Sequence, residues 1–334
     1  MTRGGAAGRA ASFIAVAVIA WLVFDAVVRP ASGPLAIANI LSTFLVVGTI
    51  LIVAVAAIRG GRLPRVALIG LVVVVALRFG DEWISPPAAE PPGPTVDVAT
   101  WNLEFGAVGV ETMREGLTSL DVDIVAVHEL TREQVAAIEG DPTLIARFPY
   151  RALFPAAGAG VEGIGLLSRL PLSGIQSYQD PVRVSATALI DGREVAVLAA
   201  HPFPGGIRTV SAIRLPIGFD PTVRNGELAT IHRQVEELLE TGEVIVLGDF
   251  NTAPTEPGYA LLTSGLTDAH VAVGQGPGWS WRPSRLEFLG IGLLRIDLVL
   301  TSPGIEPVRS WVDCSRPGDH CLVGATLSSA PQSP

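Results

Sequence analysis

The chain has 334 residues with a formal net charge of −9, and 49% of them are hydrophobic. This length has room for one domain of about 200 to 250 residues and a further segment. Residues 96–334 contain 16 Arg, no Lys and 28 acids, a net charge of −12, which excludes the basic surface typical of a general nucleic-acid-binding protein.

Three apolar segments begin the chain. Residues 12–29, 35–58 and 64–80 are predicted as transmembrane helices within a membrane region of residues 1–83, because a helix needs about 20 apolar residues to cross a bilayer. The third segment is short, so a helix that does not cross is the alternative. Asp25 lies near the end of the first segment, where it either contacts another helix or is exposed. A Pro-rich linker of residues 84–95 follows.

The arginines predict the orientation of these segments. Arg3 and Arg9 precede the first one and three arginines lie in residues 59–65, whereas Arg29 alone lies between the first and second. With three spans, the positive-inside rule predicts a multi-pass protein of the cell membrane whose C-terminal domain is extracytoplasmic; two spans would leave that domain in the cytoplasm. Cys314 and Cys321 could form a disulfide outside the cytoplasm, or could be two small buried residues.

Apolar runs and amphipathic segments alternate along residues 96–330. Strands are predicted at residues 96–101, 123–127, 164–167, 195–199, 244–247, 296–300 and 322–327, and helices at 110–120, 132–139 and 227–239. This alternation predicts sheets covered by helices, with the functional site at the strand ends.

Polar residues follow most of these strands. Asp249 and Asn251 come directly after the apolar run 244–247, Asn102 follows the first strand and Glu129 the second. An acid and an amide placed in this way suit a phosphate group and a hard cation, although a strand ending in Asp is also a common turn. The further polar candidates along the chain are Glu162, His201, Asp297, Asp319 and His320.

Together these ordered motifs resemble the endonuclease/exonuclease/phosphatase superfamily, with its deoxyribonuclease I-like fold, over about residues 96 to 328. The resemblance implies an α+β fold, a four-layered α/β/β/α sandwich of two mostly antiparallel sheets in residues 96–330. It also implies hydrolysis of a phosphoester with Mg²⁺ as the cofactor and Mn²⁺ as the alternative ion. With its apolar N-terminal region, the chain is similar to a membrane-anchored bacterial member of that family.

The resemblance assigns residues to the metal and the phosphate. Glu129 matches the principal metal ligand, with Asn102 and Asp319 beside it. Asn251 matches an amide that holds a phosphate oxygen, a role that Asn102 would share.

The resemblance also implies the catalytic residues. Asp249 matches the residue that activates or orients the attacking water, and His320 matches an imidazole paired with Asp297. His201 matches a second histidine, and Glu162 matches its carboxylate partner by its spacing from a downstream arginine.

Several residues depart from the family pattern or stand outside it. His128 occupies a position where the family usually has Gln, which predicts altered tuning of the neighbouring metal ligand. His232 and His270 are interpreted as structural. Trp279 and Trp281 either pack in the core, which is favoured, or line a substrate cleft.

The predicted function is a membrane-anchored, Mg²⁺-dependent phosphoesterase that hydrolyses a phosphodiester or phosphomonoester by in-line attack of water. The substrate would be a nucleic acid, a phospholipid or a sugar phosphate. A nuclease acting on extracytoplasmic DNA or RNA and a phospholipid or sphingolipid phosphodiesterase are the two alternatives within this class. A catalytically silent binding module on the same fold is the alternative from another class. The bilayer is the expected partner, and the sequence indicates no protein partner.

Overall fold

The computed structural model describes residues 3–86, 90–91, 93–157, 162–210 and 215–329, which form two compact units. The helical unit contains Met1–Glu82 together with Gly205–Pro221 and Thr255–Pro257. The sandwich unit contains Trp83–Pro204, Thr222–Pro254 and Gly258–Pro334. Two short segments from the C-terminal part of the sequence therefore belong to the helical unit.

Four helices form most of the helical unit: α1 (Arg3–Val28), α2 (Gly33–Ile40), α3 (Ser42–Ile58) and α4 (Arg62–Trp83). Among the described residues, α1 and α4 are each long and apolar enough to cross a membrane. α2 and α3 would make a third span if they are counted together, but they are bent by 61°. The apolar segment 35–58 is thus two helices with a break at Leu41.

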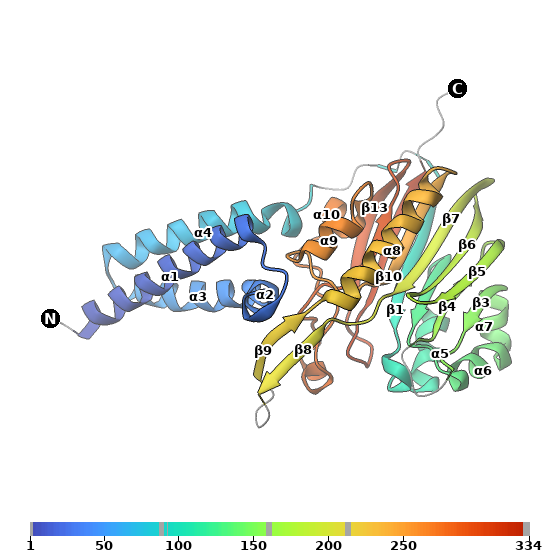
Figure 1. The fold of residues 1–334 in the computed structure, drawn as a ribbon, viewed down its shortest axis with the longest axis horizontal. Coiled ribbons are helices and arrows are strands. Elements are labelled where there is room, and N and C mark those ends of the chain that lie inside the picture. Colours follow the sequence, from blue (N-terminus) through green and yellow to red (C-terminus); the bar gives the residue numbers. More distant parts are fainter. Residues whose placement is uncertain (1–2, 87–89, 92, 158–161, 211–214, 330–334) are drawn as a thin grey trace. The chain divides into compact units, whose positions relative to one another are not determined.

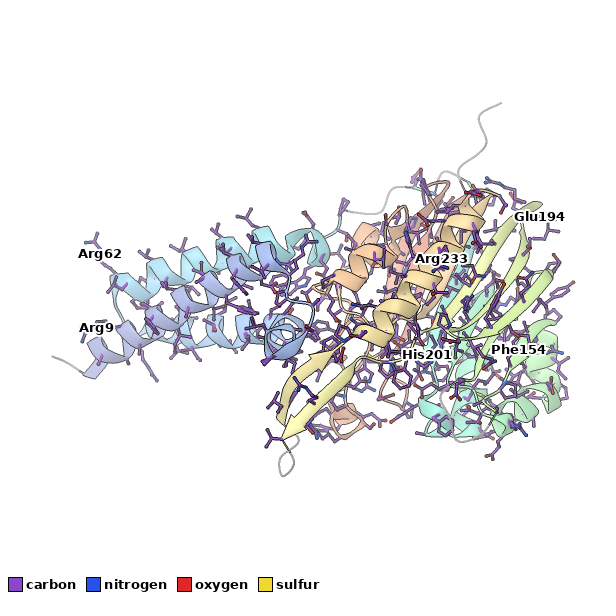
Figure 2. All side chains as sticks on the ribbon, viewed as in Figure 1. Arg9, Arg62, Phe154, Glu194, His201 and Arg233 are labelled. Carbon is purple, nitrogen blue, oxygen red and sulfur yellow. A yellow bond between two sulfur atoms is a disulfide. The ribbon has the colours of Figure 1, made fainter. Side chains whose placement is uncertain are left out.

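Many large apolar side chains of the helical unit are exposed, and small residues are among those buried between its helices. The small residues Ala11 and Ala15 are buried with Val53, whereas Phe13 is 74% and Leu77 is 82% exposed. The arginines labelled in Figure 2, Arg9 near the start of α1 and Arg62 at the start of α4, lie at one end of the unit, so α1 and α4 run in the same direction.

The one acid within α1 has a partner on another helix. Asp25 is buried, and its Oδ2 lies 3.5 Å from Nη2 of Arg78 on α4. Of the two interpretations of Asp25, the structure supports the helix contact.

A β-hairpin also belongs to the helical unit. β8 (Gly206–Val210) and β9 (Leu215–Asp220) pair in antiparallel fashion, and β9 packs against α2 (Figure 1). Beside them, Asn39 on α2 donates a hydrogen bond of 2.9 Å from Nδ2 to the carbonyl oxygen of Thr255. No sequence pattern had predicted this hairpin.

The sandwich unit is built on two six-stranded mixed sheets. The first has the order β13-β14-β1-β2-β4-β3 and the second β11-β12-β10-β7-β6-β5. In the first sheet the strands are β1 (Thr95–Asn102), β2 (Ile124–His128), β3 (Tyr150–Phe154), β4 (Ile164–Ser168), β13 (Ile305–Asp313) and β14 (Leu322–Ser329). In the second they are β5 (Leu172–Gln179), β6 (Val182–Ile190), β7 (Arg193–His201), β10 (Glu243–Asp249), β11 (Thr267–Asp268) and β12 (Asp297–Thr301).

Helices and short turns complete the sandwich unit. They are η1 (Glu104–Gly106), α5 (Val110–Ser119), α6 (Arg132–Gly140), α7 (Pro142–Arg147), α8 (Thr222–Leu239), α9 (Pro257–Leu262), α10 (Ala269–Val273) and η2 (Ser284–Leu289). η1 and η2 are 3₁₀ helices. All three predicted helices and all seven predicted strands are present, with shifted ends.

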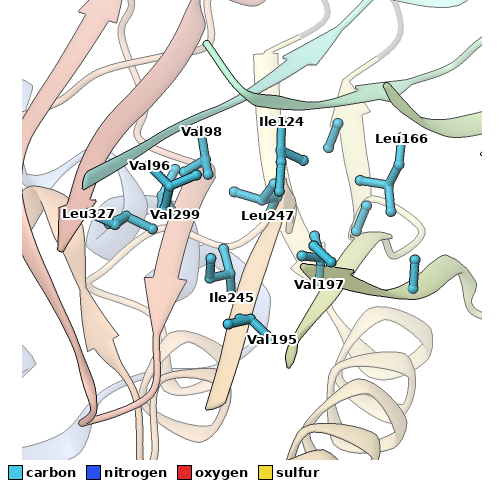
Figure 3. Close-up of a cluster of buried hydrophobic side chains, with 14 of the residues drawn as sticks. Val96, Val98, Ile124, Leu166, Val195, Val197, Ile245, Leu247, Val299 and Leu327 are labelled. Atoms are coloured by element: carbon cyan, nitrogen blue, oxygen red, sulfur yellow. The ribbon is translucent and has the colours of Figure 1, made fainter. Parts of the chain in front are cut away.

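Three apolar clusters define the layers. Side chains that alternate along the strands meet between the two sheets, among them Val98, Ile124, Val197 and Leu247 (Figure 3). A second cluster joins the first sheet to α5, α6 and α7 through residues such as Trp101, Met113, Ile138 and Leu144. A third joins the second sheet to α8 through Leu198, Leu228 and Ile231. The predicted four-layered α/β/β/α sandwich is confirmed.

Candidate active site

The ends of the neighbouring parallel strands β1 and β2 bring the first pair of polar residues together. Asn102 lies opposite His128 in the register, and Glu129 follows with a left-handed φ of 55° that turns the chain directly after the strand. Nδ2 of Asn102 donates hydrogen bonds to Glu129 Oε1 at 3.1 Å and to Asp249 Oδ2 at 3.0 Å. Its Oδ1 accepts from the backbone N–H of Glu104 at 2.9 Å. Asn102 thus orients two carboxylates with its Nδ2, while its Oδ1 accepts a backbone hydrogen bond.

The second sheet contributes the two aspartates. Asp249 on β10 and Asp297 on β12 are directly opposite in an antiparallel register, and both are buried. Gly248 allows this arrangement, because a Cβ on it would lie 2.1 Å from the carbonyl oxygen of Ala200 on β7. His201, which ends β7 (Figure 2), can therefore lie with its Nε2 3.5 Å from Asp249 Oδ2 and 3.7 Å from Glu129 Oε1.

Asn251 closes the turn after β10. It has a left-handed φ of 51°, and its backbone N–H donates to Asp249 Oδ1 at 3.0 Å. Its Nδ2 donates to the carbonyl oxygen of Pro202 at 3.0 Å, and Nη1 of the buried Arg224 donates to its own carbonyl oxygen at 2.6 Å. The segments that follow His201 and Asp249 are therefore linked through the Asn251 amide.

His320, which lies just before β14 of the first sheet, completes the group. Its Nδ1 lies 2.9 Å from Asp297 Oδ2, and its Nε2 lies 3.5 Å from Asp249 Oδ2. The hydroxyl of the buried Ser280 donates to the same Asp297 oxygen at 2.6 Å. Two donors therefore hold Asp297, and Asp297 in turn fixes the orientation of the imidazole.

The charges of these buried groups are set by their mutual contacts. Burial alone would lower the pKa of His320, but Asp297 and Asp249 raise it to about 10. Burial alone would raise the pKa of Asp249, but His320, His201 and Asn102 hold it below its usual value. His201 also has a raised pKa, because Asp249 and Glu129 outweigh its burial. At neutral pH the site therefore holds an ionised Asp249 beside a protonated His320, and His201 takes up a proton more readily than a free imidazole does.

Asp319 has an unsatisfied oxygen next to this group. Its Oδ2 accepts a hydrogen bond from Trp281 Nε1 at 3.2 Å, whereas its buried Oδ1 lies 4.0 Å from His320 Nε2 and has no hydrogen-bond partner among the described residues. Burial raises the pKa of Asp319 to about 6 against the opposing charge of His320, and Glu104 and Glu129 add to the rise. A hard cation prefers such carboxylate oxygens, so Asp319 and Glu129 fit the chemistry of a Mg²⁺ ligand set.

A second group with the composition of a metal site is Asp249, Asp297 and His320, whose ligand atoms lie within 4.8 Å of one another. To bind a cation, His320 would have to give up the hydrogen bond at Nδ1 or the proton at Nε2. The raised pKa of His320 opposes the loss of either. The Asp319 oxygen that lacks a hydrogen bond is therefore the better candidate ligand for a cation.

Glu162 is the predicted site residue for which the described residues show no contact with the rest of the candidate site. Its side chain is exposed, and the acids within 4 Å of His201 Nε2 are Glu129 and Asp249. No ion pair or hydrogen bond between Glu162 and His201 is found among the described residues, so their pairing stays a prediction. It rested on one spacing along the chain, and spacing does not fix the direction in which a loop side chain points.

The remaining histidines have local structural roles. His128 is buried, which lowers its pKa to about 3, and its Nε2 lies 2.8 Å from Thr100 Oγ1. His270 is buried with its Nε2 2.9 Å from the carbonyl oxygen of Gly276, and His232 lies on α8 near Glu236.

Sequence reasoning missed three side chains that support the site. Ser280 holds Asp297, and Trp281, which pairs with the backbone of His320, holds Asp319. Glu104 Oε2 accepts from the backbone N–H of Asp319 at 3.1 Å. Ser280 and Trp281 follow no predicted strand, so the strand-end pattern gave no signal for them, and Glu104 was passed over although it comes two residues after Asn102.

Cys314 and Cys321 form a disulfide. Cys321 directly follows His320 and is fully buried. Of the two alternatives open from the sequence, the bonded one is observed.

A four-layered sandwich with acids, amides and histidines at the ends of its central strands defines the class of deoxyribonuclease I-like phosphoester hydrolases. A family model described as "Endonuclease/Exonuclease/phosphatase family" matches residues 99–320, and the chain belongs to this family. A comparison with curated protein sequences gave no match.

Solved structures share the fold. The 3′ phosphatase NExo from Neisseria, bound to product DNA hairpin, is 20% identical, with 69% of this chain and 98% of that chain covered and a TM-score of 0.55. Humanized D. rerio TDP2 is 16% identical, with 70% and 99% covered and a TM-score of 0.54. The human Nocturnin catalytic domain is 16% identical, with 72% and 96% covered and a TM-score of 0.51. At these identities the likeness shows the fold alone.

Proposed function

We propose that this protein is a membrane-anchored, divalent-metal-dependent phosphoesterase that hydrolyses a phosphodiester or phosphomonoester by in-line attack of water. The observation that carries the proposal is the position of Asp249. Its Oδ2 lies 3.0 Å from Asn102 Nδ2 and 3.5 Å from the Nε2 atoms of both His201 and His320. A purely structural aspartate would not need two imidazoles and an amide around one oxygen.

Each residue then has a role that its contacts support. Asp249 accepts a hydrogen bond from the attacking water, and its lowered pKa favours orienting the water over retaining the proton. His320, held protonated by Asp297, donates from Nε2 to a phosphate oxygen on which charge develops. His201 is the candidate donor to the leaving alkoxide.

Glu129 and Asp319 would hold the cation, with Asn102 orienting Glu129. A bound Mg²⁺ supplies positive charge to the phosphate oxygens. Asn251 is the proposed contact of a phosphate oxygen, for which its Nδ2 would have to exchange the carbonyl of Pro202 for the substrate.

We further propose that the sandwich unit acts on the outer side of the cell membrane. The arginine distribution and the Cys314–Cys321 disulfide support this location, because disulfides persist in oxidising compartments.

The test uses the full chain purified in detergent. Hydrolysis of bis(p-nitrophenyl) phosphate and of p-nitrophenyl phosphate is measured with Mg²⁺, with Mn²⁺ and after chelation with EDTA. The expected result is activity that requires the ion and that falls by about 10³-fold or more in Asp249→Asn and in His320→Ala. Glu162→Gln is the control and should retain activity. Activity that survives both substitutions and chelation would overturn the proposal.

A further inference from the structure

The β8–β9 hairpin is an unusual part of the sandwich domain's sequence, because it belongs to the helical unit. β9 packs against α2, and the ring of Phe219 lies so close to Gly205 that a Cβ there would be 2.3 Å from it. The hairpin is thus firmly built into the unit that contains the candidate membrane spans.

The hairpin exposes apolar side chains. All five residues of β8 are exposed, and Ile207 is 62%, Val210 44% and Ile217 45% exposed. An isolated two-stranded hairpin is only marginally stable in water, and it gains nothing there from showing branched apolar residues to solvent. These side chains are suited to an apolar or interfacial environment.

α2, on which the hairpin rests, has the features of an interfacial helix. At eight residues it is about 12 Å long and cannot cross a bilayer. It is bent by 61° from α3, and it connects the end of α1 to the start of α3. Its buried residues are Ala36 and Asn39, whereas Leu35 is exposed, as on a helix that lies along a membrane surface.

The chain limits how far the active site can be from this hairpin, whatever arrangement the two units adopt. Gly205 follows His201 by four residues, and Thr255, which is bonded to Asn39, follows Asn251 by four residues. Four residues span at most about 14 Å. Two separate site residues are therefore tied by short connections to the interfacial part of the helical unit.

We propose that the β8–β9 hairpin enters the headgroup region of the bilayer that the helices cross, and that the substrate is a lipid phosphoester in that bilayer. This inference rests on the proposed function and selects one of its substrate classes. The sequence of residues 96–334, with 16 Arg, no Lys and 28 acids, supports the selection, since it offers little basic surface along which a long nucleic-acid backbone could bind.

The first experiment measures hairpin insertion without using activity. The full chain carrying Ile207→Trp is reconstituted in phosphatidylcholine vesicles with and without brominated acyl chains. After subtraction of the wild-type signal, the added tryptophan should be quenched by the brominated lipid. The matched control is Leu189→Trp, an exposed apolar residue on β6 of the sandwich unit, which should not be quenched. No quenching at position 207 would overturn the proposal.

The second experiment measures substrate class on phosphatidylcholine vesicles that also contain phosphatidylglycerol, phosphatidic acid or sphingomyelin. Wild type should release headgroup product from at least one vesicle lipid among phosphatidylglycerol, phosphatidic acid and sphingomyelin, and faster than it cleaves single- or double-stranded DNA oligonucleotides. Ile207→Asn combined with Val210→Asn should lower lipid hydrolysis about tenfold. Hydrolysis of bis(p-nitrophenyl) phosphate should stay within about twofold, because the site itself is unchanged.

The matched control is Ile175→Asn combined with Leu189→Asn, which removes two exposed apolar residues from β5 and β6 and should leave both activities unchanged. Faster cleavage of DNA than of every lipid, or equal loss of lipid and soluble activity in the hairpin variant, would overturn the inference. If no phosphoester at all is cleaved, the proposed function fails instead, and the quenching experiment still decides whether the hairpin enters the membrane.

Discussion

His320 Nδ1 lies 2.9 Å from Asp297 Oδ2. Asp297 begins β12 of the second sheet, and His320 lies just before β14 of the first sheet. The carboxylate fixes the ring and raises the pKa of the imidazole to about 10, so the ring is cationic over the whole physiological range.

Replacing this carboxylate should change the pH dependence of catalysis. Asp297→Asn removes the carboxylate that most stabilises the protonated form of His320. The pKa of the imidazole therefore falls, and the ring loses its proton at a lower pH than in wild type. We expect kcat to drop by about 10²- to 10⁴-fold and its alkaline limb to move several pH units down from about 10. A pH profile of bis(p-nitrophenyl) phosphate hydrolysis measures both. An unchanged alkaline limb would show that His320 does not act as a cation.

The same pair makes folding stability depend on pH. The pKa of His320 is raised from 6.5 to about 10, so its contribution is fully present below pH 6.5 and is lost as the pH rises toward 10. In His320→Gln the thermal midpoint should be lower than that of wild type at pH 6.5, and the difference should shrink by pH 10. Thermal unfolding of the full chain in detergent, followed at several pH values, checks this. A difference that grows with pH would contradict it.

Gly248 should be intolerant of any side chain. A methyl group there would meet the carbonyl oxygen of Ala200 and force β10 away from β7, which separates Asp249 from His201. Gly248→Ala should cost about 1 to 3 kcal/mol in stability and about 10²-fold in rate. Gly242→Ala is the matched control, because a Cβ there has open space around it, and it should alter neither quantity.

The disulfide should support both stability and the position of His320. Replacing Cys314 and Cys321 by Ala removes a short covalent loop, for which the expected loss is about 2 to 3 kcal/mol. Because Cys321 adjoins His320, we also expect a lower kcat with little change in KM. Thermal unfolding and steady-state kinetics of the double variant test this, with wild type under reducing conditions as the parallel sample. If the double variant loses stability but keeps full activity, the disulfide does not support the position of His320.

The sequence predicted those parts of the fold in which local pattern and function coincide. The apolar run 244–247 of β10 predicts a buried strand, and the change from apolar to polar residues at Asp249 marks the end of that strand as a candidate site. The apposition of Asp249 and Asp297 depends on strand register, which no local pattern encodes; the family resemblance assigned Asp297 only as the partner of His320.

Other parts of the structure have no recognisable local sequence pattern. Ser280 and Trp281 act from an irregular segment, where no periodicity distinguishes a supporting side chain from a packed one. The β8–β9 hairpin has short strands with apolar residues on an exposed surface, which contradicts the usual link between apolarity and burial. The break at Leu41 lies inside an apolar segment, where hydropathy alone cannot separate one helix from two.

The bond between Cys314 and Cys321 also bears on when this hydrolase becomes competent. With the sandwich unit on the outer side of the membrane, as proposed above, newly made chain would lack the bond beside His320 and would be oxidised only after the domain had crossed the bilayer. The cell's own phosphoesters would then meet an enzyme that is still immature, and full activity would arise only on the far side of the bilayer.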